Sequence, residues 1–168
     1  SWHMPSSKRS AKKEYMERHI TGSMFWDIDE HSDKNSPYPH MMSDSDSWKK
    51  ILCSYGIKNQ DHIVVYDFSE IYSSCRLWFS LKYFGHKKVS VLDGGLKKWI
   101  KENKKTTNKK EKITKLKDYY VIENVEWIKN KKQIDENIKN FSFTTVDARS
   151  RDRFEGKADE PRAGLKKG

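Results

Sequence analysis

The sequence predicts an α/β fold in which helices cover both faces of a mostly parallel sheet. Two short runs rich in β-branched residues, 62–66 and 89–92, are apolar enough to be buried on both faces, as strands of a parallel sheet are. Each is followed by a segment with helical periodicity, at 72–84 and 96–102. Strands that alternate with helices indicate this doubly wound architecture, because each crossover helix must pack back onto the sheet.

The residues before the first of these strands predict two further helices and a long loop. Polar helix-forming residues over 9–18 favour a helix, and a short apolar strand is expected at 23–26. Residues 27–43 are rich in Asp, Ser, Pro and His and are interpreted as a surface excursion, whose length indicates a functional purpose. A capped amphipathic helix over 44–55 follows.

A lysine-rich segment separates two predicted domains. Residues 101–117 hold eight lysines and two glutamates, with almost no apolar side chain to anchor them. Such a run is typical of a solvated tether. We therefore expect a first domain over 1–103, a linker over 104–117 and the start of a second domain over 118–168.

The second domain begins as the first one does. A strand is expected at 119–122, a helix at 124–140 and a strand at 143–148, followed by the polar turn RSRDRFEG. The segment stops before these elements could close a sheet. The chain is therefore expected to be part of a longer polypeptide.

Composition argues against several classes of protein. The net charge is +10, but the lysines are spread over the whole chain without a basic stripe and stacking aromatics, so no nucleic-acid partner is expected. The longest apolar runs fall far below the roughly 20 residues of a membrane-spanning helix, so no membrane partner is expected either. The two cysteines, Cys53 and Cys75, lack Cys-x-x-Cys spacing, so no metal site is expected and a reducing compartment fits.

Several motifs occur in an order that resembles the rhodanese superfamily: HITG, HIVVYD and VSVLDGG. The segments ERHITGSMFWDID, SPYPHMM, IYSSCRLWF and VDARSRDRFEGKADEPRAGLKKG narrow the resemblance to the two-domain thiosulfate and 3-mercaptopyruvate sulfurtransferases. The resemblance implies a rhodanese-like fold with a first, non-catalytic domain that lacks its first strand. It also implies a catalytic second domain that is truncated before its cysteine loop.

The same resemblance implies a function. The intact enzyme would transfer sulfur from thiosulfate or 3-mercaptopyruvate to a thiol, cyanide or a protein acceptor through a cysteine persulfide, without a cofactor. Its partners would be a small anionic sulfur donor and a thiol acceptor such as a thioredoxin-like protein, in the cytoplasm or, in a eukaryote, the mitochondrion. The alternative is a non-catalytic rhodanese-like binding module that docks an acidic partner or anion through its lysine-rich linker.

The resemblance also assigns candidate site residues. Arg153 and Arg162 match two arginines that grip the anionic donor, and a guanidinium fork suits carboxylate or sulfonate oxygens. Without the resemblance, these arginines are interpreted as members of surface ion pairs. Asp29 and His40 match residues of a proton relay that a serine of the catalytic loop completes. The alternative for this pair is local hydrogen bonding within a loop.

The cysteines of this chain are poor candidates for the nucleophile. Sulfur transfer needs a thiolate in a cradle of N–H groups at a helix N-terminus, but the first residue after the strand 62–66 is Asp67. Cys75 lies near Arg76 early in the next helix, where the helix dipole could activate it. We expect instead that Cys75 and Cys53 are small buried hydrophobic residues, as cysteines in apolar helices usually are.

Two departures from the family pattern bear on these expectations. Thr21 stands where the signature usually has proline, which leaves that turn less rigid, and His19 beside it is interpreted as structural. Lys157-Ala158 replaces a common threonine-glutamate pair, which leaves the preferred sulfur donor open.

Overall fold

A computed structural model describes the chain from Ser1 to Gly168, except for residues 161–163 and 165. The chain forms two compact units, an N-terminal unit over Ser1–Trp127 and a C-terminal unit over Ile128–Gly168. Across the part of the chain that is described, we find no helix with the length and apolar composition needed to cross a membrane.

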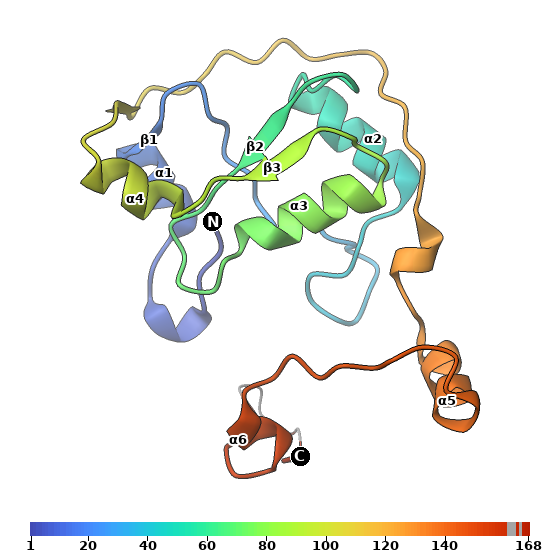
Figure 1. The fold of residues 1–168 in the computed structure, drawn as a ribbon. Helices are drawn as coiled ribbons and strands as arrows, with labels where there is room; N and C mark the ends of the chain where they lie inside the picture. Colours follow the sequence, from blue (N-terminus) through green and yellow to red (C-terminus); the bar gives the residue numbers. More distant parts are fainter. Residues whose placement is uncertain (161–163, 165) are drawn as a thin grey trace. The chain divides into compact units, whose positions relative to one another are not determined.

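The centre of the N-terminal unit is the predicted strand–helix–strand repeat (Figure 1). Strand β2 (Ile63–Val65) pairs in parallel with β3 (Val89–Val91), in the register Ile63 to Val89. Helix α3 (Ser74–Tyr83) connects the two strands and packs against both of them. Helix α4 (Gly95–Lys101) follows β3. These elements confirm the α/β arrangement that periodicity predicted.

The remaining elements of this unit come from shorter segments. Helix α1 (Ala11–Glu17) is capped by the Ser10 side chain, and α2 (Ser45–Ser54) is capped by the Asp44 carboxylate, which accepts from the Ser47 backbone N–H at 2.9 Å. Both helices were expected. The others are η1 (Pro5–Ser7), β1 (His19–Ile20), β4 (Thr106–Thr107), which pairs antiparallel with β1, and η2 (Val125–Trp127).

The hydrophobic core lies where α2 and α3 meet β2. Leu52 and Leu81 are fully buried there, and Trp48 stacks on Phe84 with ring centroids 4.6 Å apart. Tyr119 joins this core from a position far along the chain and is 2% exposed. Burial of this apolar area anchors α3, and with it the loop that precedes the helix.

Two expectations about strands in this region are wrong. Residues 23–26 form no strand, because the hydroxyl and the carbonyl of Ser23 bind the hydroxyls of Tyr66 and Tyr15 at 2.6 and 2.7 Å. Val64 was expected to be buried but is 50% exposed. It lines a cavity of about 480 Å³, because β2 has β3 as its single strand partner within the described residues.

The segment after β4 packs along the N-terminal unit and runs past α2 (Figure 1). The Leu116 backbone N–H donates to the Cys53 carbonyl at 2.9 Å. The Asn59 side chain accepts from the Tyr120 backbone N–H at 2.9 Å and donates to the Tyr120 carbonyl at 2.7 Å. Those bonds explain why the strand expected at 119–122 does not form. The structure therefore divides the chain after Trp127 and not within the lysine-rich run.

The C-terminal unit contains two helices, α5 (Lys131–Asn140) and α6 (Arg151–Phe154). The helix expected at 124–140 starts at Lys131 because Asn130 forms a capping box with Gln133. Helix α6 occupies part of the expected polar turn.

The strand expected at 143–148 does not form either. The Asn137 side chain accepts from the Phe143 N–H at 2.9 Å and donates to the Phe143 carbonyl at 2.8 Å, which takes the backbone groups that a strand partner would use. Val146 is 80% exposed as a result.

The buried histidine His86 predicts how stability depends on pH. Its Nε2 donates to the Asp61 carbonyl at 3.0 Å and its Nδ1 accepts from the Tyr119 hydroxyl at 2.5 Å, which suits the neutral ring. Burial lowers the pKa of His86, and burial also raises the pKa of Tyr119 to about 12. Folding therefore keeps both groups neutral.

We predict that the free energy of unfolding falls as pH is lowered from 7 to 5. Below about 6.5, the unfolded chain binds a proton that folded His86 rejects, which costs at most about 1.4 kcal/mol per pH unit. Urea unfolding at several pH values should show a shallower decrease for His86→Gln. His31, whose pKa burial also lowers, supplies the remaining slope. Equal slopes in the two proteins would contradict the assignment.

Candidate functional site

The loop between β2 and α3 is organised by the buried carboxylate of Asp67. Its Oδ2 accepts from the Ser69 and Ser73 hydroxyls at 2.6 and 3.0 Å, and from the Ser74 backbone N–H at 3.0 Å. Asp67 is 8% exposed. The start of α3 presents the Ser74 backbone N–H and the positive end of the helix dipole, which favour an anion. Asp67 supplies that anion from within the chain.

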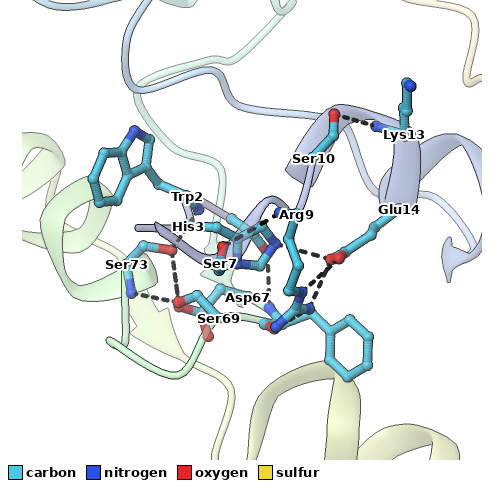
Figure 2. Close-up of polar contacts among 12 residues, drawn as sticks. Trp2, His3, Ser7, Arg9, Ser10, Lys13, Glu14, Asp67, Ser69 and Ser73 are labelled. Atoms are coloured by element: carbon cyan, nitrogen blue, oxygen red, sulfur yellow. Dashed lines mark hydrogen bonds and ion pairs between the residues drawn. The ribbon is translucent and has the colours of Figure 1, made fainter. Parts of the chain in front are cut away.

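The N-terminal segment closes over this loop (Figure 2). The Phe68 backbone N–H donates to the Ser1 hydroxyl at 2.7 Å, and the Arg9 guanidinium donates to the Phe68 carbonyl at 3.0 Å. Glu14 holds Arg9 at 2.7 Å and His3 at 2.9 Å. Together, these contacts attach the first fourteen residues to the loop that carries Asp67.

The structure brings Asp29 and His40 together. The His40 Nε2 lies 2.6 Å from Oδ1 of Asp29. Because a carboxylate only accepts, Nε2 carries the proton and the neutral ring presents a free lone pair on Nδ1. The His40 side chain is 29% exposed, so the ring remains within reach of a reactant. The arrangement can hold a proton or move one, and its role in a relay stays a prediction.

Two residues that the sequence analysis did not assign to the site surround this pair. The Trp2 indole donates to Oδ2 of Asp29 at 3.0 Å, and its ring meets the His40 ring edge-on at 4.9 Å between centroids. The Arg76 guanidinium donates to the His40 carbonyl at 2.5 Å. No periodic pattern includes Trp2, and Arg76 was considered only as a neighbour of Cys75, so the sequence contained no signal for either role.

In the C-terminal unit, Arg153 is paired with an acidic side chain. Glu160, whose side chain is 7% exposed, accepts from Nε of Arg153 at 3.1 Å and from Arg149 at 2.7 Å. Arg149 also contacts Asp147 at 2.8 Å. Arg153 and then Arg149 lower the pKa of Glu160 by hydrogen bonding, so this carboxylate is ionised. Arg162 lies outside the described residues.

The two cysteines occupy different environments. Cys53 is buried in the core, as expected, at 8% exposure. The expectation that Cys75 is buried is wrong: it lies in the first turn of α3 and is exposed, whereas its neighbour Ser74 in the same turn is buried. Among the described residues, no group of His, Cys, Asp or Glu side chains is arranged to hold a metal ion. His19 is 1% exposed, with both ring nitrogens against backbone carbonyls, which fits its structural interpretation.

A family model for the rhodanese-like domain matches residues 9–102, more than half of the chain. The chain belongs to the rhodanese-like domain family. Human 3-mercaptopyruvate sulfurtransferase is 36% identical over the whole chain, and thiosulfate sulfurtransferase from Bos taurus is 37% identical. The alignment covers 57% of each of these two proteins, so the chain spans little more than half the length of the curated relatives it matches.

Solved structures confirm the rhodanese-like fold. The Tum1 protein from Saccharomyces cerevisiae matches the whole chain and 58% of its own length, with a TM-score of 0.82 and 28% identity. SseA from Escherichia coli, described as a 3-mercaptopyruvate sulfotransferase, matches 95% of the chain and 61% of its own length, with a TM-score of 0.77 and 30% identity. Asp29, His40 and Asp67 all fall within the rhodanese-like match, whereas Arg153 follows it.

We predict that Asp67→Asn destabilises the rhodanese-like domain by about 1–3 kcal/mol, because three donors lose a charged acceptor in a buried loop. Urea unfolding measures this change. Asp93→Asn is the matched control, since the Asp93 side chain is 92% exposed and binds a lysine at the surface. The control should change stability by less than about 0.5 kcal/mol. A similarly small change for Asp67→Asn would show that the carboxylate does not organise the loop.

Proposed function

We propose that this protein is a sulfurtransferase that moves sulfur from thiosulfate or 3-mercaptopyruvate to a thiol, cyanide or a protein acceptor through a cysteine persulfide. The reaction class comes from the names of its relatives. The observation that carries the proposal is the 2.6 Å contact between Asp29 and His40. It brings together the two residues that the resemblance assigns to a proton relay.

The chemistry of the pair suits this reaction. When sulfur leaves 3-mercaptopyruvate for a cysteine thiolate, a C–S bond breaks, an S–S bond forms, and the carbon that loses sulfur takes up a proton to give pyruvate. An imidazole can deliver or hold a proton in general acid–base catalysis. The Asp29 carboxylate orients the ring and stabilises its charged form. We assign these two residues to proton transfer.

Arg153 and Arg162 are our candidates for binding the donor. A planar guanidinium binds a carboxylate or sulfonate with two parallel hydrogen bonds. One oxygen of Glu160, Oε2, now accepts from both Nε and Nη2 of Arg153. We propose that the anionic group of the donor takes the place of Glu160 there. The assignment of Arg162 rests on the resemblance of its sequence motif alone.

Neither cysteine of the chain is our candidate for the sulfur carrier. Cys53 is packed in the core, and Cys75 stands beside a helix N-terminus whose anion position is filled by Asp67. We therefore propose that the N-terminal unit is catalytically silent. The sulfur-bearing cysteine belongs to a part of the enzyme outside these residues, and the thiol acceptor, for example a thioredoxin-like protein, meets it there.

A second candidate function is a binding module. The lysines of 104–117 are exposed even though the segment packs along the N-terminal unit, which favours docking of an acidic partner. This role needs neither Asp29 nor His40.

As for compartment, we propose the cytoplasm, or the mitochondrion in a eukaryote. One relative from Arabidopsis thaliana is named as mitochondrial.

If the N-terminal unit is catalytically silent, the chain alone should form no persulfide. After incubation with thiosulfate or 3-mercaptopyruvate, mass spectrometry should find no mass increase of one sulfur atom on Cys53 or Cys75. The Cys53 thiol is buried and therefore inaccessible. The Asp67 carboxylate lies near Cys75 and repels an anionic donor there. A persulfide on Cys75 that disappears in Cys75→Ser would overturn our placement of the nucleophile.

The relay predicts a loss of turnover. In the enzyme that includes the sulfur-bearing cysteine, His40→Gln should lower kcat with 3-mercaptopyruvate by about 10²- to 10⁴-fold, the usual contribution of a general acid or base. His62→Gln is the control, because His62 is exposed and contacts Ser90, away from the pair. Unchanged kcat in His40→Gln would remove the relay from the mechanism and leave the binding module as the better candidate.

A further inference from the structure

We propose that Trp2 is a positioning residue that attaches the Asp29–His40 pair to the loop of Asp67, so that the silent loop supports the site. The pair's chemical role rests on the proposed function, whereas the support itself is a matter of contacts that can be tested in this chain. Trp2, Ser73 and Asp67 form the connection.

Trp2 reaches the loop with its backbone and the pair with its side chain. Its backbone N–H donates to the Ser73 hydroxyl at 2.9 Å (Figure 2). Its indole N–H donates to Oδ2 of Asp29 at 3.0 Å, and the indole ring packs against His40 at an interplanar angle of 78°. One residue therefore contacts both members of the pair and the start of α3.

The Asp29 carboxylate needs such a second contact. Its side chain is 61% exposed, so packing alone does not hold it. His40 binds Oδ1 and Trp2 binds Oδ2, and two directional hydrogen bonds to different oxygens prevent rotation of the carboxylate. Without Trp2, rotation about the last side-chain bond would present either oxygen, or neither, to the imidazole.

The backbone of His40 is held from the same end of α3. His40 has φ of 60°, a left-handed conformation that a residue with a side chain seldom adopts without support. The Arg76 guanidinium binds its carbonyl at 2.5 Å. Arg76 follows Ser73 by three residues, so both attachments of the pair originate in the first turn of α3 and the residue before it.

Asp67 holds Ser73, the residue from which the Trp2 attachment starts, in place. The Ser73 hydroxyl donates its hydrogen to Asp67 at 3.0 Å, which leaves its lone pairs for the Trp2 N–H. Ser73 is buried, and its hydroxyl also contacts the hydroxyl of Ser69, which is bound to the same Asp67 carboxylate. The aspartate that replaces a nucleophile in this loop thus also completes a connected support for the pair, through Ser73 and Trp2 to Asp29 and His40.

The tautomer of the His40 ring tests the proposal. In the native chain, the contact with Asp29 keeps the proton of the neutral ring on Nε2. Nitrogen-15 NMR of the histidine rings, above the pH at which the ring is charged, should show this single tautomer. In Trp2→Phe, and in the milder Ser73→Ala, a measurable fraction of the Nδ1–H tautomer should appear. Trp127→Phe, at an indole in contact with Phe79, is the control and should match the native ring.

The possible outcomes distinguish the support that Trp2 gives to the pair from the proton-transfer function proposed for the pair. A single Nε2–H tautomer in folded Trp2→Phe would overturn the proposal, and Ser73→Ala decides in the same way if Trp2→Phe does not fold. A mixed tautomer in Trp127→Phe as well would also overturn it, because the effect would then be unspecific. An unchanged kcat in His40→Gln would contradict the proposed function alone, because the tautomer is measured without turnover.

Discussion

The buried carboxylate of Asp67 at the start of α3 is the interaction on which the rest of this structure depends. It accepts from the buried Ser74 N–H at the start of a helix that the core anchors, and it orders two serines in a tight loop. The Asp67 carbonyl also accepts from the Leu96 N–H at 2.9 Å, which joins the loop to α4. A single residue therefore connects the end of β2 with two helices.

This arrangement supports our proposal that the rhodanese-like domain of this chain is catalytically silent. A helix N-terminus that holds an internal anion has no place for an external one. The same anion binds three donors of the loop, and a loop ordered in this way can support residues that act elsewhere. The Asp29–His40 pair lies on the 27–43 excursion, which contains no helix or strand and is held by local turns such as the bond from the Asp33 N–H to the Met41 carbonyl at 3.0 Å. Trp2 and Arg76 add contacts to the pair from outside this segment.

The sequence predicted the parts of the fold that depend on local periodicity. Strands β2 and β3 and helices α2 and α3 follow from apolar spacing, because each buries a face against its neighbours. Three expected strands failed for a common reason: the side chains of Tyr15, Asn59 and Asn137 bind backbone groups at positions where hydropathy predicts strand pairing. Such side-chain contacts depend on tertiary neighbours that no sequence window contains.

For the site, the sequence was informative only through resemblance. Asp29 and His40 were named on that basis, and their contact could not have been derived from their spacing of eleven residues. Trp2 and Ser73 lie 71 residues apart and carry no motif, so only the structure joins them. Cys75 was misjudged because the apolar spacing of α3 does not tell which side chains of its polar first turn are covered: Ser74 is buried there and Cys75 is not.

If Ser73 and Trp2 transmit support from the loop to the pair, Asp67 and His40 are energetically coupled. A double-mutant cycle of Asp67→Asn and His40→Gln, followed by urea unfolding, measures that connection directly. We expect a coupling free energy of at least about 0.5 kcal/mol, the lower end for residues in one hydrogen-bond network. Two changes that add to within about 0.3 kcal/mol would contradict it, because they would show that the loop and the pair are independent.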